Sequence, residues 1–275
     1  MTKNEKTINI SHELNHAKST YISDLERASQ YSSISEQFSK LSSEFQLPES
    51  SLDYHFGFGQ YKNQSDLNRS GISQDVLNNF YEYSTRFAVI VMITSSEIYL
   101  TRLLWLAKLC NYLKLNDDLL TTDLFYELGF KAKKEARYSS VPRLVDIISK
   151  ELDADFSSEN LPLFKSIYNA RNCLAHRGGE ISTDDVDKNG KFILLWKRFN
   201  FSVDGDPVET IKGLTLEAGS KIGFHFELDQ REFAIGERLI LSAQDCQNIA
   251  LTLAAFSEDI RQFIDNCARD IIHPA

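Results

Sequence analysis

The sequence lacks the patterns that identify disulfide-rich, zinc-binding or secreted proteins. Its 275 residues include four scattered cysteines, with no Cys-x-x-Cys pair and no Cys/His cluster. We therefore expect no zinc site, and reduced thiols in a cytoplasm. Residues 1–6 contain no apolar run, so the sequence predicts no signal peptide. No internal repeat is evident, and Gly57-Phe58-Gly59 lacks the Lys-Ser/Thr context of a phosphate-binding loop.

The chain also has fewer basic residues than acidic ones. The chain carries 39 acidic and 30 basic residues, which gives a net charge of −9 and a pI near 5.2. This balance argues against a protein that wraps long nucleic acid by bulk electrostatics, although it leaves room for a small cationic site. With 42% apolar and 25% charged residues, the composition is ordinary for a soluble globular protein.

The longest apolar stretch, Phe87 to Cys110, is not an uninterrupted hydrophobic run. Glu97, Arg102 and Lys108 would be costly at the centre of a bilayer. A central core helix is therefore the favoured interpretation, and we expect no membrane association. Glu97 then needs a cationic partner, either Arg102 somewhat over one turn further on or a cation from another helix.

Apolar periodicity predicts a mainly α-helical bundle. Helices are expected at about 12–46, 73–115, 122–131, 141–152, 157–177 and 242–271. Between the last two helices, residues 180–241 are predicted to form a small antiparallel β insertion, with strands at 192–201, 222–228 and 237–241. The period-two alternation of 222–228 indicates a half-buried strand. We expect one helical domain over residues 73–275 that contains this insertion.

Capping residues mark the ends of several predicted helices. Ser140, followed by Pro142, starts the helix near residue 141, and Ser242 with Asp245 forms a variant of the capping box. Ser157 or Ser158 is expected to cap the helix at 157–177. The buried face of the last helix is predicted to contain Ile249, Leu253, Phe256, Ile260 and Ile264.

Residues 1–72 are predicted to form an N-terminal helical arm and a loop. Apolar residues step by three and four along the arm, as in a coiled-coil seam, but an arm packed on its own domain fits the same pattern. These residues are Tyr31, Ile34, Phe38, Leu41 and Phe45. The loop at 48–72 holds an aromatic cluster at 54–61, which could stack on bases or pin the loop to the surface.

The stretch from Arg171 to Gly179 gathers more groups able to handle a phosphate than any other part of the chain. Tyr168, Asn172 and His176 are spaced i, i+4 and i+8, so they share one face of the predicted helix. Arg171 lies about 140° away from His176 around the helix axis. Within one ideal helix, the side chains of Arg171 and His176 therefore do not reach the same atom of a ligand. A distorted last turn, the long arginine side chain or a second copy of the helix would be needed.

The residue types of this stretch favour an anionic ligand over a divalent metal. Arginine binds phosphate through its fork of donors, and histidine exchanges a proton near neutral pH. No carboxylate lies between Arg171 and His176. A purely structural interpretation remains open: Arg171 as a surface ion-pair partner, His176 as a favourable charge at a helix C-terminus, and Cys173 as a small buried residue.

Arg-Asn-x-x-x-His near the end of a helix, in an otherwise helical chain, resembles the signature of the HEPN superfamily of RNA-cleaving domains. That signature is an arginine, usually followed by a polar residue, with a histidine after four to six intervening residues. Arg171, Asn172 and His176 match it with four residues between arginine and histidine. The resemblance covers about residues 73–178 and the last helix. The first seventy residues and residues 180–241 have no counterpart in it.

The resemblance implies a metal-independent endoribonuclease that needs no cofactor. In such chemistry a ribose 2′-hydroxyl attacks the neighbouring phosphorus and leaves a 2′,3′-cyclic phosphate and a 5′-hydroxyl end. His176 would be the general base or acid, Arg171 would stabilise charge on the phosphate, and Asn172 would position His176 or a phosphate oxygen. Two copies of the motif would meet across the twofold axis of a homodimer. Toxin–antitoxin or phage-defence biology, with an inhibitory or regulatory protein partner, would fit this activity.

Two other classes of function remain open. HEPN-like domains also serve as non-catalytic modules that bind RNA, dimerise or bind partner proteins. Alternatively, the motif is a chance match within a helical scaffold. Cleavage of RNA in the presence of a chelator would separate the first class from these two.

Further residues are expected to support an RNA site. Residues 131–137 form the most basic stretch of the chain, and we expect them to contact the RNA backbone, with ordinary solvated charge as the alternative. The expected RNA-binding residues are Lys131, Lys133, Lys134, Arg137 and Arg177. Glu97 and Tyr168 are supporting candidates, Glu97 as a group that could orient Arg171.

Overall fold

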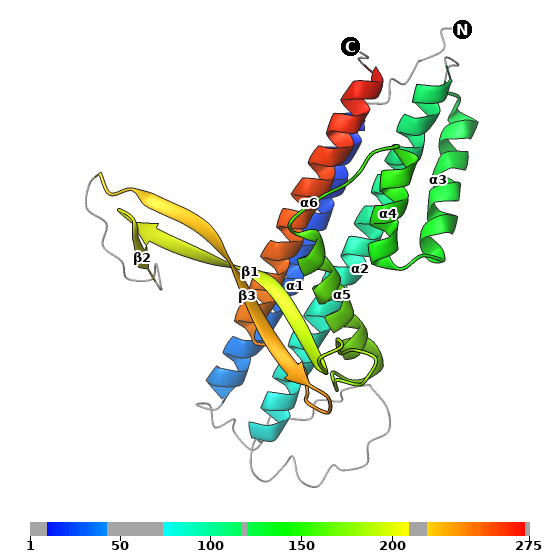
Figure 1. The fold of residues 1–275 in the computed structure, drawn as a ribbon. Helices are drawn as coiled ribbons and strands as arrows, with labels where there is room; N and C mark the ends of the chain where they lie inside the picture. Colours follow the sequence, from blue (N-terminus) through cyan, green and yellow to red (C-terminus); the bar gives the residue numbers. More distant parts are fainter. Residues whose placement is uncertain (1–9, 43–73, 117–119, 209–218, 273–275) are drawn as a thin grey trace, which may run out of the picture.

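The computed structural model describes residues 10–42, 74–116, 120–208 and 219–272. The fold is mainly helical with a small antiparallel sheet, as the periodicity predicts (Figure 1). The helices are α1 (Ile10–Ser42), α2 (Gln74–Leu115), α3 (Thr122–Arg137), α4 (Val141–Glu151), α5 (Leu161–His176) and α6 (Ala243–Ile272). The sheet follows α5 and precedes α6 in the chain, and it contains β1 (Lys191–Val203), β2 (Asp206–Val208) and β3 (Ile222–Ala234).

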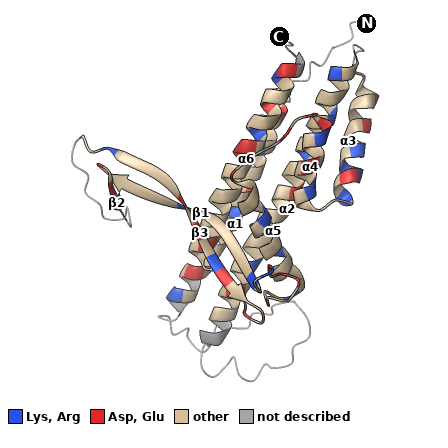
Figure 2. Ribbon diagram, in the orientation of Figure 1, with Lys and Arg blue, Asp and Glu red and all other residues tan. Residues whose placement is uncertain are grey.

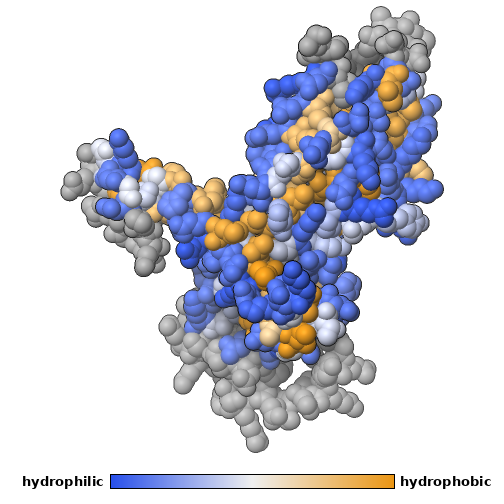
Figure 3. All heavy atoms as spheres, in the orientation of Figure 1, coloured by the Kyte–Doolittle hydropathy of each residue, from blue (hydrophilic) through white to orange (hydrophobic). Residues whose placement is uncertain are grey.

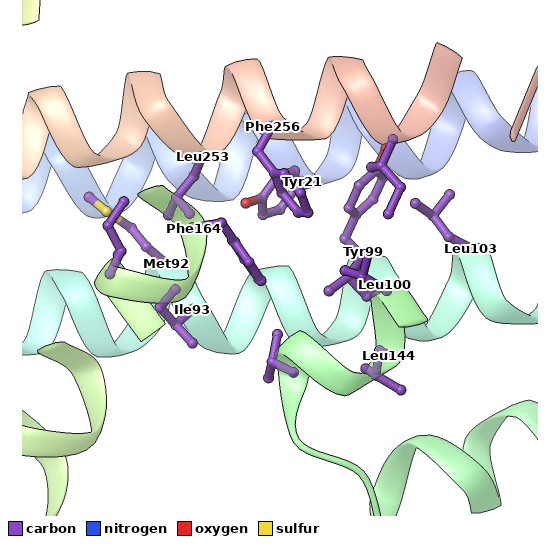
Figure 4. Packing of buried hydrophobic residues seen from close by; sticks show 14 of the residues in the cluster. Tyr21, Met92, Ile93, Tyr99, Leu100, Leu103, Leu144, Phe164, Leu253 and Phe256 are labelled. Atoms are coloured by element: carbon purple, nitrogen blue, oxygen red, sulfur yellow. The ribbon is translucent and has the colours of Figure 1, made fainter. Parts of the chain in front are cut away.

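The three long helices α1, α2 and α6 pack side by side and form most of the core (Figures 1 and 4). Aromatic pairs join the helices. Tyr21 of α1 stacks on Tyr99 of α2 with ring centroids 4.7 Å apart, and Phe164 of the shorter helix α5 stacks on Phe256 of α6 at 4.3 Å. The hydroxyl groups of Tyr21 and Ser96 lie 2.7 Å apart, so this buried polar pair is satisfied. Burial of these rings ties α1 to the same core as the rest of the bundle.

Helix α2 is long and apolar enough to cross a membrane by length and composition alone. In the structure, however, 56% of its most apolar window is buried inside the bundle. Leu100, Leu103 and Leu104 are fully buried against neighbouring helices. This burial matches the predicted core helix.

The predicted apolar seam of α1 is wrong where the structure describes it. Tyr31 and Ile34 are 64% and 61% exposed, and the buried face instead carries Leu14, Ala17, Tyr21, Leu25 and Ala28. Alanine and serine at the later buried positions let α1 approach its neighbours, and the buried hydroxyl of Ser35 donates to the carbonyl of Tyr31 at 2.8 Å. The side chains of Phe38 and Leu41, the whole of Phe45 and the aromatic loop at 48–72 lie outside the described residues.

Two helix boundaries differ from the prediction. Helix α3 continues to Arg137, because the basic stretch after residue 131 places the small residues Ala132 and Ala136 on its buried face. Helix α5 begins at Leu161 after Asn160, not at Ser157. The N-cap is Asn160 and not Ser158. The Ser158 hydroxyl accepts from the backbone amide of Asn160 at 3.1 Å and donates to Asp259 of α6, whose carboxylate also accepts from the side-chain amide of Asn160 at 2.6 Å.

Other predicted helix signals are confirmed. Ser140 is the N-cap of α4, with Pro142 in the first turn. At α6 the amide of Asp245 donates to the Ser242 hydroxyl at 3.0 Å, and the amide of Ser242 donates to the Asp245 carboxylate at 2.7 Å, which is a reciprocal cap. All five residues predicted for the core face of α6 are at most 2% exposed.

Strands β1 and β3 pair antiparallel over 13 residues each, from Lys191 opposite Ala234 to Val203 opposite Ile222. The short strand β2 lies on the other side of β1, so the strand order is β2-β1-β3. The base of the hairpin packs on the bundle through Phe192, Leu194 and Trp196, and the rest projects away from it (Figure 1). The strand predicted at 237–241 is absent; this segment makes one isolated bridge, Arg238 with Glu180.

The expectation of a half-buried strand at 222–228 is wrong. Ile222, Phe224, Phe226 and Leu228 are 47–66% exposed. The alternating pattern correctly places them on one face of β3, but no other described element covers that face. Period-two alternation shows that a strand has an apolar face, and it does not show that the chain itself covers this face.

Candidate functional site at the end of α5

The motif helix ends in a rigid turn. Gly178 and Gly179 have φ values of 69° and 89°, the left-handed conformation expected of a glycine stop. The amides of Arg177 and Gly179 both donate to the carbonyl of Cys173, at 3.0 and 3.2 Å. The carbonyl of Gly179 then accepts from the amide of Leu239 at 2.7 Å. The end of α5 is therefore fixed against the segment that leads into α6.

Arg171 is half-buried and is held by its neighbour. Its Nη1 donates to Oδ1 of Asn172 at 3.1 Å, and its Nε is buried without a hydrogen-bond partner in the structure. Within the described ranges no carboxylate lies within ion-pair distance of Arg171. A half-buried guanidinium without an acid is energetically unfavourable, so this arrangement is suited to accepting an anion.

His176 is the last residue of α5 and is exposed. Its ring makes no hydrogen bond or ion pair with any other residue that the structure describes. Tyr168 and Asn172 are half-buried and precede it by two turns and one turn. Because α5 is α-helical through His176, the roughly 140° offset between Arg171 and His176 holds in the folded chain.

Arg177, an expected RNA contact, is placed in an internal ion pair. Its Nη2 bonds to Oδ1 of Asp185. Oδ2 of Asp185 accepts from the amide and the hydroxyl of Ser182, at 2.9 and 2.8 Å. Arg177 thereby connects the helix end to the turn before the sheet, and this role accounts for its charge without a ligand.

Arg86 of α2 is a cation near the motif that the sequence did not point to. Its Nη1 lies 3.8 Å from the position that a Cβ on Gly178 would occupy. Arg86 makes no ion pair with any residue in the described part of the chain. It precedes Arg171 by 85 positions, so only the packing of α5 on α2 brings it to the motif.

Cys173 is not suited to nucleophilic chemistry. Burial raises the pKa of its thiol, and the nearby charge of Asp185 adds to this effect, against the opposing influence of Arg177 and Arg86. The thiol donates to the carbonyl of Glu180 at 3.3 Å. The buried structural role expected for this residue fits both observations.

Glu97 does not take the expected supporting position. It is half-exposed, and in the regions that the structure covers it forms no ion pair with Arg102 or with Arg171. Partial exposure to solvent removes the need for a cationic partner, because a hydrated carboxylate carries little desolvation cost. Nothing in the geometry supports a role for Glu97 in orienting Arg171.

The basic stretch of α3 is not brought to the motif. Arg86 at the motif and Lys108 beside α3 are 22 positions apart on α2, about 33 Å along a straight helix. Lys108 reaches Glu135 of α3 at 2.8 Å, which fixes α3 at this far end. Lys131 pairs with Glu127 of its own helix at 2.7 Å, and α3 carries acidic as well as basic positions along its length (Figure 2). Lys133, Lys134 and Arg137 are exposed.

Two pockets lie away from the motif. One, of about 970 Å³, opens at the turn between α3 and α4 and is lined by both signs of charge, including Glu135, Arg143 and Glu151. The other, of about 260 Å³, lies between α1 and α2 beside His16 and Trp105. Within the described residues, no group of three or more His, Cys, Asp and Glu side chains is placed to hold a metal ion. Neither pocket is lined by a residue of the motif.

Comparison with known proteins adds no family assignment. No family model, no curated protein and no solved structure matches this chain.

Proposed function

We propose that the protein is a metal-independent endoribonuclease with a HEPN-like site at the end of α5. The observation that carries the proposal is the uncompensated Arg171, which is half-buried, held by Asn172 and without an acidic partner among the described residues, one and a half turns before the exposed His176. A cation of this kind is a ready site for a phosphate. An exposed imidazole nearby supplies a group that exchanges protons near neutral pH.

The proposed reaction needs two proton transfers and one developing charge. A base removes the proton from the ribose 2′-hydroxyl as its oxygen attacks phosphorus, and an acid protonates the departing 5′-oxygen. His176 is the only titratable side chain of the motif suited to either role, and each role contributes about 10² to 10⁴ in rate. Arg171 stabilises the charge that builds on the phosphate oxygens, with Asn172 fixing its guanidinium.

A second copy of the chain would complete the site. The 140° offset keeps Arg171 and His176 of one helix apart, so Arg171 of one chain would act with His176 of the other. Apolar surface for such a contact lies beside the motif: Tyr83 and Phe87, which flank Arg86 on α2, are 66% and 62% exposed. Exposed aromatic residues next to unpaired arginines are the composition typical of protein interfaces.

Incubation of the purified protein with mixed RNA in excess EDTA tests the proposal. We expect cleavage, with 2′,3′-cyclic phosphate and 5′-hydroxyl ends on the products. The Arg171→Ala and His176→Ala variants should be inactive, whereas Lys165→Ala, which removes an exposed cation from the same helix, should cleave normally. Complete loss of cleavage in EDTA, restored by a divalent ion, would contradict the proposal.

A second candidate function is a non-catalytic HEPN-like module that binds RNA or a protein partner. The specific observation that favours it is the separation of Arg171 from His176, because binding needs only the cation. The two functions differ in one readout. A binding module would retain RNA in a filter or mobility assay, would lose it on Arg171→Ala, and would leave the RNA intact.

A further inference from the structure

The projecting part of the hairpin has two chemically different faces. We call residues 198–203 of β1 and 222–230 of β3 the arm; from here on this name means this part of the hairpin and not the N-terminal helix. Phe199, Phe201, Phe224 and Phe226 cluster on one face with ring centroids 4.5–5.6 Å apart, and Leu228 extends the same face. Phe224, Phe226 and Leu228 are 62%, 50% and 66% exposed, and apolar surface is visible on the arm in Figure 3. Exposed contiguous apolar surface of this kind marks an interaction site.

The two outer edges of the sheet differ in how far other residues cover their backbone groups. The outer edge of β1 is covered by side chains: the Ser166 hydroxyl bonds to the amide and carbonyl of Leu195, at 3.0 and 3.2 Å, and Thr252 accepts from the amide of Lys197 at 2.8 Å. Nearer the tip, β2 covers β1 and includes Pro207, which has no N–H to offer another strand.

The outer edge of β3 has no comparable protection. At its base, Arg231 reaches the carbonyl of Ile240 at 3.2 Å and the carboxylate of Asp245 at 2.8 Å. Over residues 222–230, no described strand or helix lies against the side of β3 that faces away from β1. A long strand edge that also displays apolar side chains is a template for pairing with another strand.

We propose that this edge pairs with the same edge of a second copy of the chain, antiparallel about a twofold axis at Phe226. The sequence of β3 favours this partner, because its apolar residues Phe224 and Leu228 lie at equal distances on either side of Phe226. Phe226 would face its own equivalent, and Phe224 would face Leu228 of the second copy, with the reciprocal pair on the other side of the axis. A twofold contact between identical strands is self-complementary by construction.

Charge agrees with this register. The pairing places His225 opposite Glu227 of the second copy twice, once on each side of the axis. A register centred on Leu228 would instead place Glu227 opposite Asp229, and one centred on Asp229 would set two Asp229 carboxylates against each other. Like charges directly opposite destabilise a strand pair, so the register at Phe226 is favoured over those centred on Leu228 and Asp229, and over one centred on Glu227, which would oppose two Glu227 carboxylates. The product is a six-stranded sheet whose two aromatic clusters form one continuous face.

This contact is separate from the dimer proposed for the motif. The arm projects from the bundle, whereas the motif lies at the end of α5 against α2 (Figure 1). If both contacts form on different axes, the assembly is larger than a dimer. Failure of either proposal leaves the other standing, since one is read out by RNA cleavage and the other by cross-linking within β3.

A cysteine scan of β3 tests the register directly. The background is Cys267→Ser, because the other three cysteines are buried and Cys267 is the one that is partly exposed. Opposed residues of an antiparallel pair have Cβ atoms about 4.5–5.5 Å apart, close to disulfide geometry. We expect Phe226→Cys to form a disulfide-linked species of twice 31.4 kDa under mild oxidation. Gln230→Cys is the matched control, since its two copies would lie about 27 Å apart.

A charge at the interface gives an independent measurement without an oxidant. Leu228→Glu places a carboxylate opposite Phe224 of the second copy and should raise the dissociation constant of the arm contact by about tenfold or more. Gln230→Glu, on the same face two residues further on and at the end of the contact, opposite Ile222 of the second copy, should raise it less than Leu228→Glu does. A cross-link that forms equally at residues 226 and 230, or no cross-link at residue 226, would overturn the proposal.

Discussion

Cations lie in opposite situations near the two ends of α2. At the far end, Lys108 is nearly buried and lies between Glu135 and Glu151, so its charge is neutralised by two acids. At the motif end, Arg171 and Arg86 have no acidic partner within the described residues. Charge that the fold itself neutralises is structural. Charge that the fold leaves uncompensated, at a helix end beside an exposed histidine, is available to a ligand.

The largest effect should come from removing the side chain of Arg171 or that of His176. We expect Arg171→Ala and His176→Ala each to lower the rate of RNA cleavage by about 10² to 10⁴, because each removes a group that would act on the reacting phosphate in the proposed reaction. Initial rates on a labelled RNA measure this loss, and circular dichroism checks the fold.

The control for this comparison is at the other end of the molecule. Lys133→Ala with Lys134→Ala removes two exposed charges from α3 and should leave cleavage of a short RNA nearly unchanged. If the α3 variant lost as much activity as the motif variants, total positive charge and not the motif would determine the rate, and the contrast between the two ends would disappear.

An intermediate effect is expected from the neutralised cation. Lys108→Met keeps most of the side-chain volume but leaves Glu135 and Glu151 facing each other without a cation. We expect a loss of about 2 kcal/mol in the free energy of unfolding, since the three groups are only partly buried. Urea unfolding at pH 7 measures it. Lys131→Ala, which removes an exposed i,i+4 pair with Glu127, should cost about 0.3–0.5 kcal/mol.

The stabilisation by Lys108 should depend on pH in one direction. Burial lowers the pKa of Lys108, but its bonds to Glu135 and Glu151 outweigh burial and leave the pKa raised above 10.5. A raised lysine pKa means that the stabilisation is complete below the unfolded value and is lost as pH rises through the folded value. The difference between wild type and Lys108→Met should therefore shrink above about pH 10.5. A constant difference from pH 7 to 11 would show that the ion pairs contribute nothing.

The smallest effect concerns salt. If a long RNA that leaves the motif also crosses α3, Lys133 and Lys134 bind its backbone phosphates. Their replacement by alanine should then flatten the slope of log affinity against log salt by about 0.7 for each phosphate that is no longer neutralised. A short RNA held at the motif would not reach α3, about 33 Å away. Equal slopes for the variant and the wild type on long RNA would remove α3 from the RNA path.

Local signals in the sequence predicted most of the helices and both long strands. The cap of α6 was predictable because Ser242 and Asp245 bond to each other's amides within three residues. The end of α5 was predictable because Gly178 and Gly179 favour the conformation that the turn requires. Arg171, Asn172 and His176 were identifiable as a candidate site because they belong to one short stretch.

Features that depend on long-range packing could not be read from local patterns. Ser158 resembled the N-cap, but α5 begins after Asn160, and the Ser158 hydroxyl also donates to Asp259, 101 residues later. Arg86 reaches the motif only because α5 packs on α2. Tyr31 and Phe224 have the periodicity of buried residues, yet the helices and strands around them leave both exposed. Periodicity assigns residues to faces, and only the packing decides which faces are covered.

Mixing two inactive variants is the most direct test of the central claim, that Arg171 of one chain acts with His176 of another. Equal amounts of Arg171→Ala and His176→Ala protein are allowed to exchange subunits and are then assayed on RNA in EDTA. Each mixed dimer would hold one site with both groups intact, so activity should recover to about one quarter of wild type. Two variants that are inactive alone and remain inactive after proven exchange would contradict the shared site.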